Sequence, residues 1–265
     1  MSYKKTFQRL KKGKEKALVP FVVIGDPDYN TSLQIVRKIA EAGADILELG
    51  YAFSDPIADG STIQAADTRA LANGINTDKC FNFIRKVRGF TDVPIGLLVY
   101  SNLVLQRGIN RFYADARNVG VDSVLLADVP AEESGEFIQA ARKNKIETVF
   151  IVSPLTNNIR LRRIVAKTKG FVYIVSRLGV TGARGQLDKG TLSLVRRVRR
   201  QTKYPLCVGF GISNPEQVRS VLAAGADGAI VGSAIVSIIQ HNLRDKKKMI
   251  SQIGRFVQKL KQATL

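Results

Sequence analysis

Short, continuous runs of apolar and β-branched residues recur along the whole chain, and they constrain its fold more than any other feature. Eight such runs are separated by segments with the apolar spacing of helices. The runs are Ala17–Ile24, Ile46–Leu49, Ile95–Tyr100, Ser123–Leu126, Thr148–Val152, Phe171–Ser176, Pro205–Phe210 and Ala229–Val231. They do not alternate between apolar and polar residues, as half-exposed strands do. We therefore expect the strands of a parallel sheet that is buried on both faces.

Helical patterns fill the gaps between these runs. An apolar stripe begins at Leu33, and a second one spans Lys246–Ala263. Ser213 and Glu216 form a capping-box pattern around Pro215, which predicts a helix start. Regular alternation of apolar runs with helices is typical of α/β folds.

A short motif marks three of the junctions between a helix and the next strand. It reads AGAD at Ala42–Asp45, VGVD at Val119–Asp122 and AGAD again at Ala224–Asp227. A glycine after the last helical turn supplies the left-handed conformation that ends many helices. The recurring junction supports repeated strand–helix units.

The count of eight strands predicts a single (β/α)8 TIM barrel that occupies residues 1–265 as one domain. An open, doubly wound sheet remains an alternative. The gap between Leu49 and Ile95, after the second strand, is long enough for extra helices. The segment Arg177–Gly190, after the sixth strand, contains four glycines and is expected to form a mobile loop or an ordinary flexible connection.

Cysteine usage and the N-terminal segment indicate the compartment. The chain has two cysteines, Cys80 and Cys207, and no C-x-x-C pair, so we expect no thiolate zinc site. Cys207 lies in an apolar run and is expected to be a small core residue. The basic segment Met1–Lys16 lacks the apolar centre of a signal peptide, and no run of about 18 apolar residues is present. These features predict a cytoplasmic protein without a membrane span.

The chain has a single histidine, His241, in a polar stretch before the last helix. A histidine-ligated metal or a Ser-His-Asp triad is therefore not expected. General acid–base chemistry has to come from carboxylates, tyrosine or lysine.

The formal net charge of +19 needs an explanation. One interpretation is binding of a polyanion such as nucleic acid. The other is a solvated basic surface that attracts anionic substrates or an acidic partner. The basic residues are scattered, and no aromatic ladder or nucleic-acid motif accompanies them, so we favour the second interpretation and expect no nucleic-acid partner.

Two carboxylates are candidates for catalysis. Glu48 lies inside an apolar strand, where its side chain turns either to solvent or into the barrel mouth. Burial in the mouth would raise its pKa and make it an acid near neutral pH. Asp59 follows in the loop Ser54–Gly60, where Asp55 and Asp59 also suit turn or helix-cap roles.

Two glycine-bearing turns follow the last two strands. VGFGIS at Val208–Ser213 contains Gly211, and VGSA at Val231–Ala234 contains Gly232 and Ser233. Paired turns at this place are typical of phosphate sites in barrel enzymes, although tight turns without a ligand would look the same. Tyr173 lies within a strand and either faces the pocket or fills the barrel.

These residues lie within longer segments that resemble the tryptophan synthase α chain family over essentially the whole chain. The segments include PFVVIGDPD at Pro20–Asp28, ELGYAFSDPIADGSTIQ at Glu48–Gln64 and YIVSRLGVTGAR at Tyr173–Arg184. The combination of FSDPxADG with SRxGVTGA is specific, because a general phosphate-binding barrel would show only the glycine turns. The resemblance implies the barrel fold and a retro-aldol-type cleavage of indole-3-glycerol phosphate into indole and glyceraldehyde 3-phosphate.

The resemblance also implies roles for individual residues. It makes Glu48 the catalytic acid, Asp59 the group that accepts the indole N–H, and Tyr173 a neighbour of the glycerol portion. Arg177 and Thr181 would belong to a lid. The implied phosphate ligands are Gly182, Gly211, Gly232 and Ser233. The implied lining of the indole pocket is Phe21, Ile63, Leu98, Leu125 and Phe210.

The family works with a pyridoxal-phosphate-dependent β chain in a heterotetramer of two α and two β chains. The resemblance therefore implies a β-chain partner, no metal and no cofactor on this chain, and pyridoxal phosphate on the partner. The implied docking residues are Asp55, Pro56, Asn102 and Asp128. The chain departs from the family at Tyr51-Ala52, where Ile-Pro is usual, and at Ser61, where Pro is usual.

Two alternatives remain open. One is a stand-alone lyase that releases free indole, or another barrel acting on a phosphorylated sugar. The other is a catalytically weak regulatory subunit that binds polyanions through the basic surface.

Overall fold

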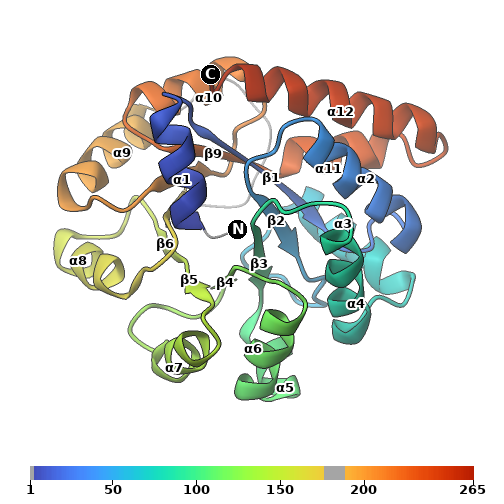
Figure 1. The fold of residues 1–265 in the computed structure, drawn as a ribbon, viewed down its shortest axis with the longest axis horizontal. Coiled ribbons are helices and arrows are strands. Elements are labelled where there is room, and N and C mark those ends of the chain that lie inside the picture. The colour runs from blue at the N-terminus through green and yellow to red at the C-terminus, as the bar shows by residue number, and fades with distance from the viewer. Residues whose placement is uncertain (1–2, 176–188) are drawn as a thin grey trace.

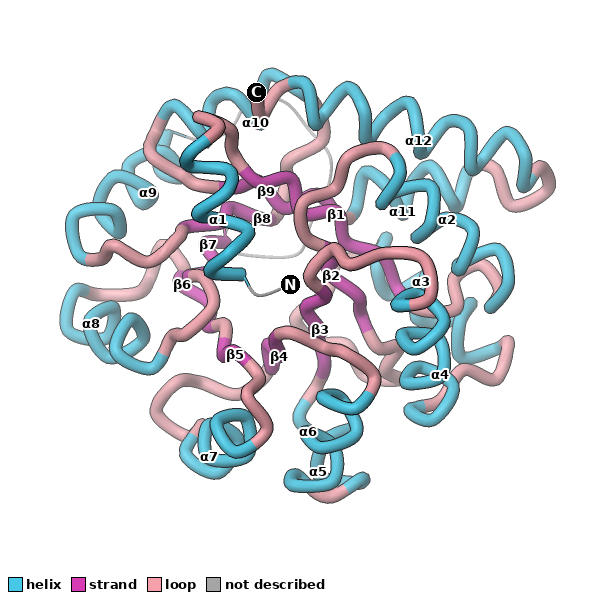
Figure 2. Tube along the Cα trace, viewed as in Figure 1, coloured by secondary structure: helices cyan, strands magenta, loops and turns pink. Residues whose placement is uncertain are grey.

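The computed structural model describes residues 3–175 and 189–265. Within these residues the strands form one parallel sheet, in the order β5-β4-β3-β2-β1-β9-β8-β7-β6. The strands are β1 (Ala17–Val23), β2 (Leu47–Gly50), β3 (Ile95–Val99), β4 (Ser123–Leu126), β5 (Glu147–Thr148), β6 (Phe150–Val152), β7 (Val172–Val175), β8 (Leu206–Gly209) and β9 (Gly228–Val231). They lie in a ring with the helices around the outside (Figure 1, Figure 2).

The strands at the two ends of this order, β5 and β6, follow each other directly along the chain. β5 pairs with β4, β6 pairs with β7, and only Val149 separates β5 from β6. The fifth apolar run, predicted as one strand, therefore changes its pairing partner at Val149. This arrangement confirms the predicted barrel, with eight strand positions around the ring and the fifth divided in two.

Helices follow most strands and cover the outer face of the ring. They are α1 (Tyr3–Lys12), α2 (Tyr29–Glu41), α3 (Ser61–Ala72), α4 (Thr77–Arg88), α5 (Ser101–Arg107), α6 (Ile109–Asn118), α7 (Gly135–Lys143), α8 (Asn158–Lys167), α9 (Lys189–Gln201), α10 (Pro215–Ala223), α11 (Ser233–His241) and α12 (Lys246–Gln262). Two of them, α3 and α4, occupy the long interval between β2 and β3. Among the described residues, no helix combines the length and the apolar character that crossing a membrane requires.

The three junction motifs end helices as predicted. Gly43, Gly120 and Gly225 have φ angles of 100°, 88° and 107°. These values lie in the region that glycine enters without the steric penalty of a Cβ atom. Each glycine therefore turns the chain from a helix into the following strand.

The predicted start of α10 was wrong by one residue. The N-cap is Asn214, whose side chain accepts a hydrogen bond from the Gln217 backbone N–H. Pro215 takes the first helical position, which suits proline because its missing N–H would have no partner there. The residue just before it becomes the cap, and Ser213 instead donates its backbone N–H to the Gln217 side chain at 2.7 Å.

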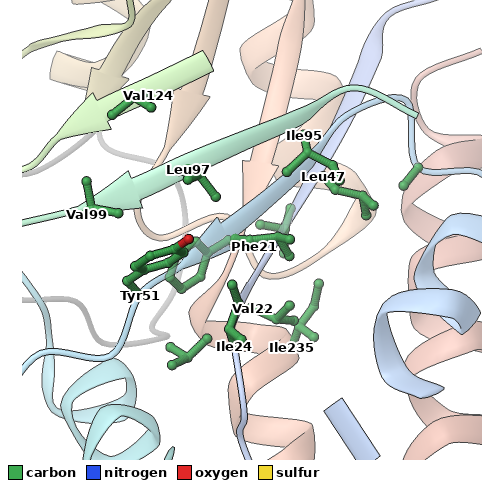
Figure 3. Packing of buried hydrophobic residues seen from close by; sticks show 14 of the residues in the cluster. Phe21, Val22, Ile24, Leu47, Tyr51, Ile95, Leu97, Val99, Val124 and Ile235 are labelled. Carbon is green, nitrogen blue, oxygen red and sulfur yellow. The ribbon is translucent and has the colours of Figure 1, made fainter. Parts of the chain in front are cut away.

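Alternate residues of the strands enter two different cores. In β7, Tyr173 and Val175 belong to the cluster inside the barrel, whereas Val172 and Ile174 belong to the cluster between strands and helices. Figure 3 shows part of this outer cluster, with Val22 from β1 near Ile235 from α11. Burial on both faces explains why the strand sequences are apolar throughout.

The helix α1 covers the amino-terminal end of the barrel. Its first residue, Tyr3, is buried in the inner cluster, and its hydroxyl lies 2.8 Å from that of Ser123, at the start of β4. A Cβ atom at Gly96 or at Gly170 would collide with the Tyr3 ring or hydroxyl, so these glycines make room for it. With this end filled, a site in the barrel has to open at the carboxyl-terminal end.

Candidate active site

A cavity opens at the carboxyl-terminal end of the barrel and measures about 460 Å³, counting solvent at its mouth. Strand residues and the loops that follow the strands form its wall. The lining residues are Phe21, Glu48, Asp59, Gly60, Ile63, Leu98, Tyr173, Phe210, Gly211, Ile212, Ile230, Gly232 and Ser233. The structure thus brings together residues that are separated by up to about 200 positions in the sequence.

Glu48 points into this cavity from β2. It lies beside Phe21 of β1 and Gly96 of β3 in the strand register, and only 4% of its surface is exposed. Among the described residues, no group hydrogen-bonds its Oε2 atom. Burial, followed by the nearby negative charge of Asp59, raises the pKa of Glu48 from 4.5 to about 8. The group is therefore a neutral acid at pH 7.

Asp59 reaches the same cavity from the loop between β2 and α3. Its Oδ2 atom accepts a hydrogen bond of 2.7 Å from the Tyr100 hydroxyl, which itself accepts one from the Ala58 backbone N–H. Burial raises the pKa of Asp59, and the Tyr100 hydrogen bond opposes that rise. This bond holds one carboxylate oxygen and favours the charged form, leaving the other oxygen for a ligand.

Tyr100 is a site residue that the sequence did not single out. It comes directly after β3, and its ring stacks on Phe53 with the centroids 4.9 Å apart. Its place at the carboxyl end of a barrel strand was the available signal. A polar side chain at that end can reach the site. Here the Tyr100 hydroxyl donates a hydrogen bond to Asp59, which lies in the loop after the neighbouring strand β2.

Tyr173 stands inside the barrel beside β8. A Cβ atom at Gly209 would lie 2.5 Å from the Tyr173 hydroxyl, so only glycine leaves room for this ring. Burial, with Glu48 and Asp59 nearby, raises the pKa of Tyr173 well above 10. Its hydroxyl stays protonated and can donate a hydrogen bond to a ligand.

The corner formed by Gly211, Gly232 and Ser233 has the features of an anion site. Gly232 is the N-cap of α11, and this helix has neither a side-chain cap nor an acidic residue in its first turn. Gly232 and Ser233 line the cavity, so the first backbone N–H groups of α11 and the positive end of its dipole lie beside it. Gly211 has a φ of 87°, a conformation that lets the preceding loop expose its backbone.

The remaining predicted pocket residues divide into two groups. Phe21, Ile63, Leu98 and Phe210 form the apolar part of the lining. Leu125 is buried in the same inner cluster as Tyr173 but is not one of the lining residues. Gly60, Ile212 and Ile230 also line the cavity, and they were not selected from the sequence. Three further predicted residues lie outside the described residues, namely Arg177, Thr181 and Gly182.

The four residues predicted to dock a partner lie on neighbouring loops. Asp55 and Pro56 follow β2, Asn102 is in α5 after β3, and Asp128 follows β4, and these three strands are adjacent in the sheet. Asp128 accepts hydrogen bonds of 2.8 Å and 2.7 Å from the backbone and hydroxyl of Ser101. The four predicted docking residues therefore lie on one side of the rim around the cavity.

The part of the chain that the structure describes contains no group of three or more His, Cys, Asp or Glu side chains arranged to hold a metal ion. Glu48 and Asp59 both line the apolar slot, and burial raises the pKa of both carboxyl groups.

Comparisons with known proteins agree on one family. A family model for the tryptophan synthase alpha chain matches residues 7–265. The tryptophan synthase alpha chain of Methanothermobacter thermautotrophicus is 49% identical over 263 residues, which cover 99% of this chain and 96% of that protein. That of Cronobacter sakazakii is 49% identical over 267 residues, covering 99% and 98%.

Solved structures give the same result for the fold. The tryptophan synthase α2β2 complex of the hyperthermophile Pyrococcus furiosus contains a chain with a TM-score of 0.87 and 39% identity, covering 93% of this chain and 98% of that one. Tryptophan synthase subunit alpha of Legionella pneumophila has a TM-score of 0.89 and 32% identity, covering 100% and 98%.

Proposed function

The chain belongs to the tryptophan synthase α chain family, and we propose that it cleaves indole-3-glycerol phosphate into indole and glyceraldehyde 3-phosphate. The observation that carries this proposal is the pairing of a neutral Glu48 with a hydrogen-bonded Asp59 across one cavity. The reaction needs one group that gives a proton and another that stays negative, and the Tyr100 hydrogen bond, which opposes the rise in the pKa of Asp59, supports this division of roles.

The carboxylates divide the chemistry between them. Glu48 donates its proton to C3 of the indole, which leaves a positive charge delocalised onto the ring nitrogen. Asp59 accepts a hydrogen bond from the ring N–H and stabilises that charge. The Glu48 carboxylate then takes the proton from the hydroxyl on the adjacent side-chain carbon. The bond to C3 breaks, its electron pair returns to the ring, and the aldehyde forms, so Glu48 is protonated again at the end.

The other lining residues bind the substrate. The phosphate is held by the backbone around Gly211 and by Gly232 and Ser233 at the start of α11. The indole ring lies in the apolar slot between Phe21 and Leu98. Tyr173 donates a hydrogen bond near the glycerol portion, where its protonated hydroxyl is available. In the family, Arg177, Thr181 and Gly182 would complete the site from a lid, and we propose the same roles here.

The partner is proposed by the same reasoning. The solved structures that resemble this chain include tryptophan synthase α2β2 complexes. We propose that a β chain docks on the rim carrying Asp55, Pro56, Asn102 and Asp128 and receives indole from the cavity. The proposed reaction uses carboxylates alone, so pyridoxal phosphate would belong to the β chain. We also propose that the whole chain acts as one domain.

The test is an assay of indole and glyceraldehyde 3-phosphate released from indole-3-glycerol phosphate, with and without a tryptophan synthase β chain. We expect equal amounts of both products and a faster rate with the β chain. A rate that the β chain leaves unchanged would favour a stand-alone lyase. No product under either condition, together with salt-sensitive retention on a nucleic-acid column, would favour the polyanion-binding alternative.

A further inference from the structure

A second cavity lies outside the barrel, among α2, α3 and α4, which are neighbours in Figure 1. It measures about 860 Å³, counting the solvent at its opening. The residues that line it are Gly25, Tyr29, Ala70, Asn73, Ile75, Lys79, Asn82, Arg85 and Lys86. None of them lines the cavity of the active site, and none is acidic.

The three cations of this cavity are oriented by neutral groups. The Lys79 ammonium donates to the Gly74 carbonyl at 2.7 Å, and the Arg85 guanidinium donates to the Asn82 side-chain oxygen at 2.6 Å. The Lys86 ammonium lies 4.9 Å from the centre of the Tyr29 ring. All three cations are exposed, and these contacts orient their positive charges without neutralising any of them.

The carboxylates around the cavity are engaged with other cations. Asp26 forms two hydrogen bonds with Arg69, at 2.7 Å and 3.0 Å. Asp28 pairs with Lys246 at 2.9 Å, and Asp78 pairs with Arg107 at 2.7 Å. Among the described residues, no carboxylate oxygen lies within ion-pair distance of Lys79, Arg85 or Lys86. The positive charge of the cavity is therefore left for a ligand.

The walls of the cavity also have an apolar part. Ile75 is buried, and its side chain packs against the Gly25 backbone, where an added Cβ atom would lie 3.1 Å from it. The Tyr29 ring is partly exposed and is held edge-on against Phe83, with the centroids 5.5 Å apart. An aromatic ring beside exposed cations suits a flat organic group that carries phosphates.

We propose that this cavity binds a phosphorylated small organic anion, whose phosphates contact Lys79, Arg85 and Lys86 and whose organic part packs on Tyr29 and Ile75. The site is separate from the barrel mouth and does not depend on the proposed reaction. It gives part of the net charge of +19 a specific use. The Asn82 side-chain nitrogen is an additional donor, because only its oxygen is engaged by Arg85.

Protection of individual lysines from acylation tests the proposal in the intact protein. Mass spectrometry would follow the acylation rates of Lys79, Lys86 and Lys143 with ATP or inorganic pyrophosphate, at constant ionic strength. We expect ATP to slow acylation of Lys79 and Lys86 at least fivefold and to leave Lys143, on α7, unchanged. Readout at single lysines separates this cavity from any anion bound at the barrel mouth.

Matched variants complete the test. Arg85→Gln should raise the ATP concentration for half-protection of Lys86 roughly tenfold, as expected for loss of a charge-assisted hydrogen bond. Arg142→Gln removes the same charge from α7 and should leave that concentration within twofold. Equal protection of all three lysines, or equal effects of both variants, would overturn the proposal. Pyrophosphate protecting as well as ATP would overturn the role given to Tyr29 and Ile75.

Discussion

Replacing Glu48 by Gln should stabilise the protein, and the gain should depend on pH. The folded state raises the pKa of Glu48 from 4.5 to about 8. Between these values the folded protein holds a proton that the unfolded chain releases, so the free energy of unfolding falls as pH rises through this window. At about 1.4 kcal/mol per pKa unit, the full difference is on the order of 5 kcal/mol.

The amide of Gln has the size of the protonated carboxyl and does not titrate. The Glu48→Gln variant and the wild type should therefore unfold at similar urea concentrations at pH 4, below the window. At pH 9 the variant should be more stable by on the order of 2–5 kcal/mol, because the wild type then carries a buried charge.

The assay is urea unfolding of both proteins at pH 4, 6, 8 and 9. The buried acids Asp67 and Glu147, with pKa values raised to about 8 and about 7, titrate in the same range. Both are present in the variant, so comparison at each pH removes their contribution. A stability difference that stays constant from pH 4 to pH 9 would refute the claim that Glu48 is neutral in the folded protein.

Three further substitutions test other parts of the site. Tyr100→Phe keeps the stack on Phe53 but removes the hydrogen bond that lowers the pKa of Asp59. The pKa of Asp59 should therefore rise, and the acidic limb of the plot of kcat/KM against pH should move to higher pH. An unmoved limb would show that Tyr100 does not act on Asp59. Gly209→Ala places a Cβ atom 2.5 Å from the Tyr173 hydroxyl and should destabilise the protein by about 1–3 kcal/mol in urea unfolding; unchanged stability would mean that the ring moves freely. Gly211→Val forces a β-branched residue to a φ of 87° and should raise KM more than it lowers kcat; a steady-state KM like that of the wild type would remove Gly211 from phosphate binding.

The sequence predicted the barrel because strand burial and helix periodicity are local signals. Strands buried on both faces have to be apolar throughout, and the three glycine junctions need left-handed backbone whatever the tertiary fold. The division of the fifth strand at Val149 could not be predicted, since it depends on which neighbours β5 and β6 pair with. The start of α10 was misplaced because Ser213 and Asn214 are both good caps, and the position of Pro215 decided between them.

The site was predicted less completely, for a physical reason. Glu48 is recognisable because burying a carboxylate in an apolar strand costs free energy, so its presence there points to a function. Tyr100 escaped notice because it ends an apolar run and its partner Asp59 lies 41 residues earlier in the chain. Such pairings are made by the ring of strands and leave no local pattern in the sequence.

Tyr51, where the resemblance leads us to expect Ile, has a defined place in the structure. The Tyr51 ring is buried and packs edge-on against Phe81 and Phe112, with centroid distances of 5.8 Å and 6.1 Å. It fills the space between β2 and the helices α4 and α6, outside the barrel. Tyr51 therefore packs on the outer side of the segment that leads to the Asp59 loop, whereas Glu48 is positioned by β2 itself.

Indole release by the Glu48→Gln variant is the most direct test of the proposed chemistry. Its rate on indole-3-glycerol phosphate at pH 7 would be compared with the wild type, alongside the affinity of each protein for glycerol 3-phosphate. We expect turnover to fall at least about a thousandfold, since the proton donor is lost, and the affinity to stay within twofold. Turnover within tenfold of the wild type, at unchanged affinity, would contradict the assignment of Glu48 as the acid.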